Sequence, residues 1–220
     1  MINIRQIITA AALMLCSLQI LAMNDRKPDF AFPAQVAANA ETNLDKALKS
    51  SDFKEAIHQF INLQLARTAI DPDSIKKAIA MADSITPLIT DPPCHAIMYM
   101  LTARMYADYY SDDRWMFDLR ELPLTPLPDD ISEWSGEQFK AEIDRLITEA
   151  MADPKMLSDE PTRSYSGIIS ADRRQLVYYP TLLDFMAAQA ISLYESTGSP
   201  SSARALLEEI TRRSEPGSAP

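Results

Sequence analysis

The stretch Leu44–Leu65, LDKALKSSDFKEAIHQFINLQL, decides the fold class of this chain. It ends one amphipathic helix, breaks at Ser50–Asp52 and begins a second helix. The apolar residues of the second helix follow spacings of three and one, which place them on one stripe of a helix: Phe53, Ala56, Ile57, Phe60 and Ile61. Two helices joined by so short a turn must lie antiparallel and bury their stripes against each other. The stretch therefore predicts a helical hairpin.

The rest of the chain contains further periodic segments with helix start signals. Asp and Ser are favoured N-cap residues, and proline fits the first helical position because its missing N–H has no partner there. We expect helices over 34–49 and 51–69, and further helices that open at Asp71–Pro72, Asp91–Pro92, Ser135, Tyr179–Pro180 and Ser199–Pro200. The only candidate strand is Leu176–Tyr179. The sequence predicts an all-α fold of about seven helices, arranged as antiparallel hairpins in an irregular bundle or solenoid.

The first 22 residues have the pattern of a secretory signal peptide. A short basic start, Met1–Arg5, precedes the apolar run Ile7–Ile20, and Ala22 offers a small residue before a cut. A membrane anchor is the alternative, but a bilayer span needs about 20 apolar residues and this run is shorter. Lipidation at Cys16 is a third possibility, although Leu15 is bulkier than the residue that usually precedes a lipidated cysteine. We expect an exported protein of the periplasm or cell envelope, without a membrane span once the signal is cleaved.

Cleavage of this signal leaves Cys94 as the only cysteine, so an intramolecular disulfide cannot form and an apolar core must stabilise the chain. We expect an extended leader at 23–33, one helical-hairpin domain at 34–213 and a disordered tail or linker at 214–220. With only four glycines, the chain cannot assemble a glycine-rich phosphate-binding loop. Its net charge of −10 argues against nucleic acid as a partner, because phosphates would be repelled.

Candidate residues for chemistry do not form a recognisable site. Cys94 and His95 are neighbours on a helix, where adjacent side chains do not face each other, so we interpret Cys94 as a small side chain at a helix start. His58 falls on the polar side of its helix. The acidic pairs Asp112–Asp113 and Asp129–Asp130 lack the loop that wraps a calcium ion. The sequence predicts no catalytic residues, no cofactor and no metal site.

Two connections are longer than a hairpin requires, and we expect them to meet a protein partner. Leu119–Glu133 contains three prolines, and Asp153–Gln175 has weak periodicity. We expect the aromatics Trp134 and Tyr165, which lie in or beside these segments, to be exposed and to be candidate contact residues; the alternative is that both pack onto their own bundle. Residues 111–160 contain fourteen acidic and five basic residues, which indicates a solvated acidic face or a docking surface for a basic partner.

Local segments resemble known families. Ser51–Phe60 resembles the turn and second helix of a tetratricopeptide repeat, but a regular 34-residue period does not continue. The stretch from FPAQVAANAETNLDKAL to ADRRQLVYYPTLLDFMAAQAI resembles the N-terminal helical region of exported bacterial alpha-2-macroglobulin-like proteins of the Bacteroidetes type. That resemblance implies a system that traps or restrains proteases through macroglobulin β-domains, a bait segment and sometimes a thioester. The CxEQ thioester sequence is absent, since Cys94 is followed by His95, Ala96 and Ile97.

These observations lead to one main hypothesis and two alternatives. The first is a non-catalytic interaction or scaffold module of the bacterial cell envelope, whose partners are downstream macroglobulin domains or envelope proteins. The second is a free-standing periplasmic tetratricopeptide-like adaptor. The third is a glycan-binding outer-membrane lipoprotein with a helical scaffold, which would need an aromatic sugar platform made from Trp115 and Trp134. The sequence does not indicate an oligomeric state.

Overall fold

A computed structural model describes residues 32–121, 127–169 and 175–214. The predicted signal peptide, most of the leader and nearly all of the tail lie outside these residues. Seven helices of eleven or more residues make up the described part, and they match the seven predicted segments: α2 Pro33–Lys49, α3 Phe53–Ile70, α4 Ile75–Ile85, α5 Pro92–Asp112, α7 Gly136–Ala150, α10 Leu182–Ser196 and α11 Pro200–Ser214. No β-strand occurs among the described residues, so the all-α prediction is confirmed.

Short helical turns connect the long helices. Three are α-helical: α6 Arg114–Asp118, α8 Pro154–Asp159 and α9 Gln175–Tyr178. Four are 3₁₀-helical: η1 Pro72–Ser74, η2 Thr86–Leu88, η3 Ile131–Glu133 and η4 Thr162–Tyr165. Within the described residues, no helix is long and apolar enough to cross a membrane.

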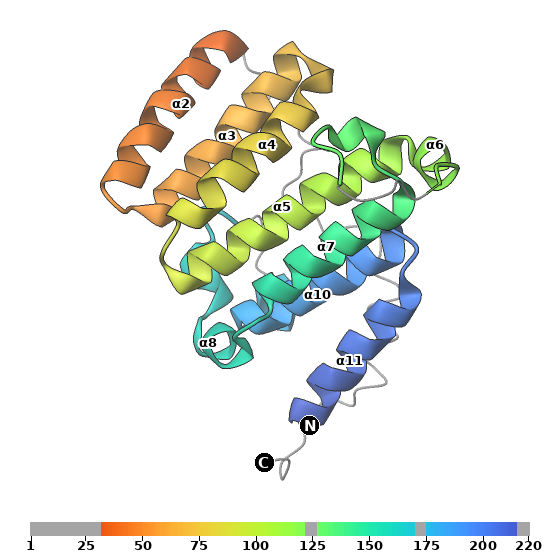
Figure 1. Cartoon of the computed structure of the whole chain (residues 1–220). Helices are drawn as coiled ribbons and strands as arrows, with labels where there is room; N and C mark the ends of the chain where they lie inside the picture. The colour runs from red at the N-terminus through yellow and green to blue at the C-terminus, as the bar shows by residue number, and fades with distance from the viewer. Residues whose placement is uncertain (1–31, 122–126, 170–174, 215–220) are drawn as a thin grey trace.

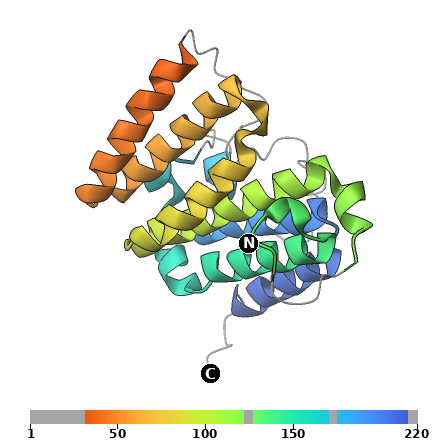
Figure 2. The same ribbon diagram turned by 45° about the horizontal axis from the view of Figure 1, so that its top comes forward.

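The helices pack around α5, which contacts α3, α4, α6, α7, α8 and α10. The α2–α3 hairpin lies at one end of the molecule, and α11 extends from α10 at the other (Figures 1 and 2). The turn between α2 and α3 is closed by Ser51, whose φ of 58° is left-handed, and by the Asp52 amide, which donates to the Ala47 carbonyl at 2.9 Å. The Asp52 side chain then caps α3 by accepting from the Glu55 amide. The predicted hairpin is confirmed.

Other helix starts follow the same capping chemistry. The Asp91 carboxylate accepts from the Cys94 amide at the start of α5. At α7, Ser135 and Gln138 form both bonds of the predicted capping box. A second capping box opens α10, between Thr181 and Asp184. The prediction that Tyr179–Pro180 opens this helix is therefore wrong by about two residues, because the Thr181 hydroxyl accepts from the otherwise free Asp184 amide in the first turn.

The structure also shows what two weakly patterned segments in the second half of the chain form. Leu176–Tyr179, the one candidate strand, is not a strand, since 175–178 forms the helical turn α9. The connection Asp153–Gln175, whose periodicity is weak, contains α8 and η4. Four of its apolar side chains, Leu157, Tyr165, Ile168 and Ile169, are buried. Short segments of this kind carry too few turns to show a period, and α8 is stabilised by its packing against α5 and α10.

An aromatic cluster fills the core between α5, α6 and α7. Phe139 of α7 lies at its centre, fully buried, with the ring centroid of Phe117 at 4.8 Å and that of Trp134 at 5.3 Å. The rings of Tyr106, Tyr109 and Tyr110 complete the cluster from α5. Such tilted and offset pairs stabilise a core beyond the burial of their area. The cluster fixes the position of α6 against the bundle.

Candidate protein-interaction surface

Trp134 is part of this cluster and not part of the surface. Only 5% of the residue is exposed. Its indole Nε1 donates to the Pro128 carbonyl at 2.8 Å, and its ring stacks on Tyr106 with the centroids 5.7 Å apart. Trp134 thus ties the end of the proline-rich connection to α5 and α7.

Tyr165 is also buried, with 3% of the residue exposed. Its hydroxyl donates to Glu160 Oε2 at 2.9 Å, and Lys54 Nζ of α3 lies 4.3 Å from the centre of its ring. Burial, together with the hydrogen bond to Glu160, raises the pKa of this hydroxyl. The expectation that Trp134 and Tyr165 are exposed is wrong, and the alternative, in which both pack onto their own bundle, describes the structure. The sequence could not show which helices cover a loop.

Cys94 occupies the position expected of a small side chain at a helix start. It lies in the first turn of α5 and is 1% exposed. Burial, and after it the hydrogen bond to Asp91, raise the pKa of the thiol far above its usual range. The His95 ring stacks on Tyr99 at 4.6 Å, and its Nε2 has no hydrogen-bond partner among the described residues. A buried thiol with a raised pKa is a poor nucleophile at neutral pH, because only the thiolate attacks.

The remaining candidates for chemistry are surface groups. His58 lies beside Glu55, with 3.5 Å between Nδ1 and the carboxylate, and its side chain is 45% exposed as predicted. Asp130 accepts from the Ser132 amide at 2.8 Å and lies 3.5 Å from Lys76 Nζ. In the part of the chain that the structure describes, no group of three or more His, Cys, Asp or Glu side chains is placed to hold a metal ion.

Large apolar side chains that are exposed at the surface are candidates for contact with a partner. Their described members are Phe32, Ile70, Leu88, Trp115, Leu119, Leu127, Val177, Tyr178 and Leu207. Trp115 and Leu119 stand out because they are four residues apart on α6 and its C-cap, and so share one face. They are 69% and 76% exposed. Val177 and Tyr178, in contrast, are adjacent on α9 and point about 100° apart. We refer to Trp115 and Leu119 together as the α6 face.

The opposite side of α6 is held firmly to the bundle. Phe117 is 1% exposed and packs into the aromatic cluster. The Tyr110 hydroxyl donates to Asp118 Oδ1 at 2.6 Å, and Arg114 Nε donates to Asp118 Oδ2 at 3.3 Å. Arg114 also reaches the Ser196 carbonyl at the end of α10, with Nη1 and the oxygen 3.4 Å apart. Although partial burial acts to raise it, the bonds from Tyr110 and Arg114 lower the pKa of Asp118. These bonds link α6 to α5 and to the end of α10.

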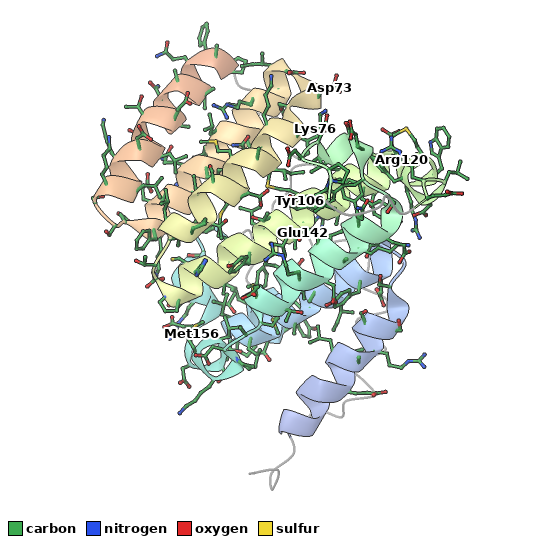
Figure 3. All side chains as sticks on the ribbon, viewed as in Figure 1. Asp73, Lys76, Tyr106, Arg120, Glu142 and Met156 are labelled. Carbon is green, nitrogen blue, oxygen red and sulfur yellow. The ribbon has the colours of Figure 1, made fainter. Side chains whose placement is uncertain are left out.

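The segment that follows α6 is fixed in the same way. Arg120 lies next to α6 at the end of the bundle (Figure 3) and donates from Nη1 to the carbonyls of Ser132 and Trp134. Its guanidinium carbon lies 5.1 Å from the centre of the Phe117 ring. Gly198 leaves room for Arg114, because a Cβ at this position would collide with the guanidinium. The α6 face is therefore two exposed apolar side chains on a rigid base.

The sequence held a weak signal for the α6 face. In Arg114–Asp118, RWMFD, Trp115 and Phe117 are two residues apart. Two residues on an α-helix correspond to a rotation of about 200°, so these side chains lie on opposite sides. In the glycan-binding hypothesis Trp115 forms a sugar platform together with Trp134, and burial of Trp134 removes that partner. No family model matches the chain, and no curated protein or solved structure is significantly similar to it.

Proposed function

We propose that this chain is a non-catalytic helical interaction and scaffold module of a bacterial cell envelope. The observation that carries the proposal is the α6 face, in which Trp115 and Leu119 are mostly exposed while Phe117 anchors the same helix in the core. Tryptophan is among the residues most enriched at the energetic centres of protein interfaces. A rigid base lowers the cost of binding, since little conformational freedom remains to be lost.

The chemistry of the other candidates supports a binding role over a catalytic one. The Cys94 thiol is buried and its pKa is raised, while His58 is an exposed side chain beside Glu55. The proposal includes export because of the signal-peptide pattern. It includes membership of an alpha-2-macroglobulin-like system because of the sequence resemblance. The module would position or connect other parts of such a system.

A free-standing tetratricopeptide-like adaptor is the second candidate, and the hairpin of α2 and α3 supports it. Both candidates would use an exposed surface to hold another protein, and they differ in the identity of that protein. The gene neighbourhood separates them, because a downstream reading frame with macroglobulin domains favours the first candidate.

Site-specific photocrosslinking tests the proposed function. We would place p-benzoylphenylalanine at position 115, and in a matched control at position 177, where Val177 is 76% exposed on α9. In cells that naturally produce the chain, we expect a discrete protein adduct from position 115 and none from position 177. Leu119→Ala should reduce the yield at position 115, because it removes half of the apolar face.

The proposal would be contradicted by two outcomes. One is the same pattern of adducts from positions 115 and 177, which would indicate random encounter. The other is no adduct at position 115 under conditions in which a known interface crosslinks. Circular dichroism of each variant establishes that the helical fold is intact.

A further inference from the structure

The surroundings of the α6 face are acidic. Between residues 112 and 121 the chain carries four acidic and two basic side chains. Three of the acids, Asp112, Asp113 and Glu121, are exposed residues that flank the α6 face in the chain. None of these three carboxylates lies within 4 Å of a cationic group among the described residues. Their charge is left uncompensated by the fold.

The cations of this region, in contrast, already form ion pairs or hydrogen bonds within the chain. Arg114 pairs with Asp118 and binds the Ser196 carbonyl. Arg120 binds two backbone carbonyls and lies over the Phe117 ring. Lys140 of α7 pairs with Glu137 at 2.9 Å and lies 3.8 Å from Asp118. Each of these cations already has a partner within the fold, and with four acids against two bases residues 112–121 carry a net charge of −2. The charge presented around the α6 face is therefore negative.

From this arrangement we propose that the α6 face docks a positively charged segment of a partner protein, in which Lys or Arg residues stand next to a large apolar side chain. The apolar side chain packs on Trp115 and Leu119, and the cations pair with the free carboxylates of Asp112, Asp113 and Glu121. The proposal rests on the proposed interaction function and names the chemistry of the partner. A polar rim around an apolar centre is the usual anatomy of an interface.

The same charges argue against a second copy of this chain as the occupant. The whole chain carries a net charge of −10, and two α6 faces brought together would place like charges opposite each other. Juxtaposed like charges cost several kcal/mol at an interface. An anionic membrane surface is disfavoured for the same reason.

A peptide selection tests this proposal without assuming a sequence. A random dodecapeptide library is selected on the immobilised chain, after depletion on a Trp115→Ala/Leu119→Ala variant. We expect the enriched peptides to carry net positive charge and at least one large apolar residue. Measured by fluorescence anisotropy, the best peptide should bind the double variant at least about thirtyfold more weakly, the loss that truncation of one hot-spot residue already produces.

Two further variants separate the parts of the proposal. Asp112→Asn/Asp113→Asn/Glu121→Gln should weaken binding and flatten its dependence on salt, since screening acts on the charge pairs alone. Val177→Ser/Tyr178→Ser, which removes a comparable exposed apolar pair on α9, should leave binding unchanged. Equal affinity of the wild type and the Trp115→Ala/Leu119→Ala variant would overturn the proposal.

Enrichment of neutral or acidic peptides, or of no peptide that distinguishes the two proteins, would overturn it as well. These failures are distinguishable from failure of the proposed function. A specific adduct at position 115 together with acidic or neutral peptides would retain the interaction function and refute the basic partner. If no specific adduct forms at position 115 and no basic peptide is enriched, the two proposals are refuted together.

Discussion

Replacement of Phe139 by alanine should be among the most destabilising single changes in this chain. The side chain is fully buried, and its ring centroid lies 4.8 to 6.5 Å from those of Phe117, Trp134, Tyr110, Tyr109 and Tyr106. Truncation of a buried Phe to Ala costs about 3–5 kcal/mol from lost transfer free energy and the cavity left behind. The aromatic pairs each add about 0.5–1.5 kcal/mol beyond burial, although not additively. We therefore expect a loss of about 4–5 kcal/mol.

Phe185 provides a matched control. It is 4% exposed, and its one aromatic neighbour among the described residues is Tyr179, with ring centroids 6.3 Å apart. Phe185→Ala should cost about 3 kcal/mol, the lower end of the range for a buried Phe. The difference between the two variants isolates the contribution of the aromatic cluster.

The assay is urea unfolding in a Trp115→Phe background, in which Trp134 is the only tryptophan. Its fluorescence reports on the cluster directly, and circular dichroism at 222 nm reports on the whole helical fold. Coincident transitions justify a two-state free energy. Two results would refute this explanation of the core: a loss of less than about 1 kcal/mol in the free energy of unfolding of Phe139→Ala, or equal losses in Phe139→Ala and Phe185→Ala.

Three other predictions concern the region around α6 and the thiol. Gly198→Ala should destabilise by at least about 1 kcal/mol, because the residue has a φ of +79° and a Cβ would collide with Arg114; a lower urea midpoint would be the measurement, and an unchanged midpoint would contradict it. Because the pKa of Asp118 is lowered from its ordinary 3.8, its bonds stabilise the fold above that pH and are lost as the pH falls through the lowered value. Between pH 7 and pH 3 the free energy of unfolding should therefore fall more in the wild type than in Asp118→Asn. An equal fall in both proteins would count against the Tyr110–Asp118 bond. Cys94 should react with 5,5′-dithiobis(2-nitrobenzoate) only at the rate of unfolding, since it is 1% exposed and its pKa is raised; rapid labelling of the native chain would show an accessible thiol.

Helix capping explains why the architecture could be predicted from sequence. Ser135 and Gln138 form the capping box that their spacing indicates, and Asp52 and Asp91 cap the helices that follow them. These are local interactions between residues three apart, so the sequence contains both partners. The exception is informative, because Tyr179–Pro180 offered a competing start signal and the capping box at Thr181 prevailed.

The interaction surface could not be predicted in the same way. Trp134 and Trp115 are equally conspicuous in the sequence, and both lie near the proline-rich connection. One is 5% exposed and the other 69%. Their difference depends on whether rings from α5 and α7 reach each side chain, which is a property of packing between segments distant in the chain.

The amino-acid sequence by itself determined the all-α class, the hairpin of α2 and α3 and the start of most helices, because periodicity and capping act within a few residues. Only the tertiary structure decided that Trp134 and Tyr165 belong to the core, that Asp153–Gln175 packs onto the bundle, and that Trp115 and Leu119 remain at the surface. Burial is the sum of contacts made by residues far apart in the chain, and no local pattern records that sum.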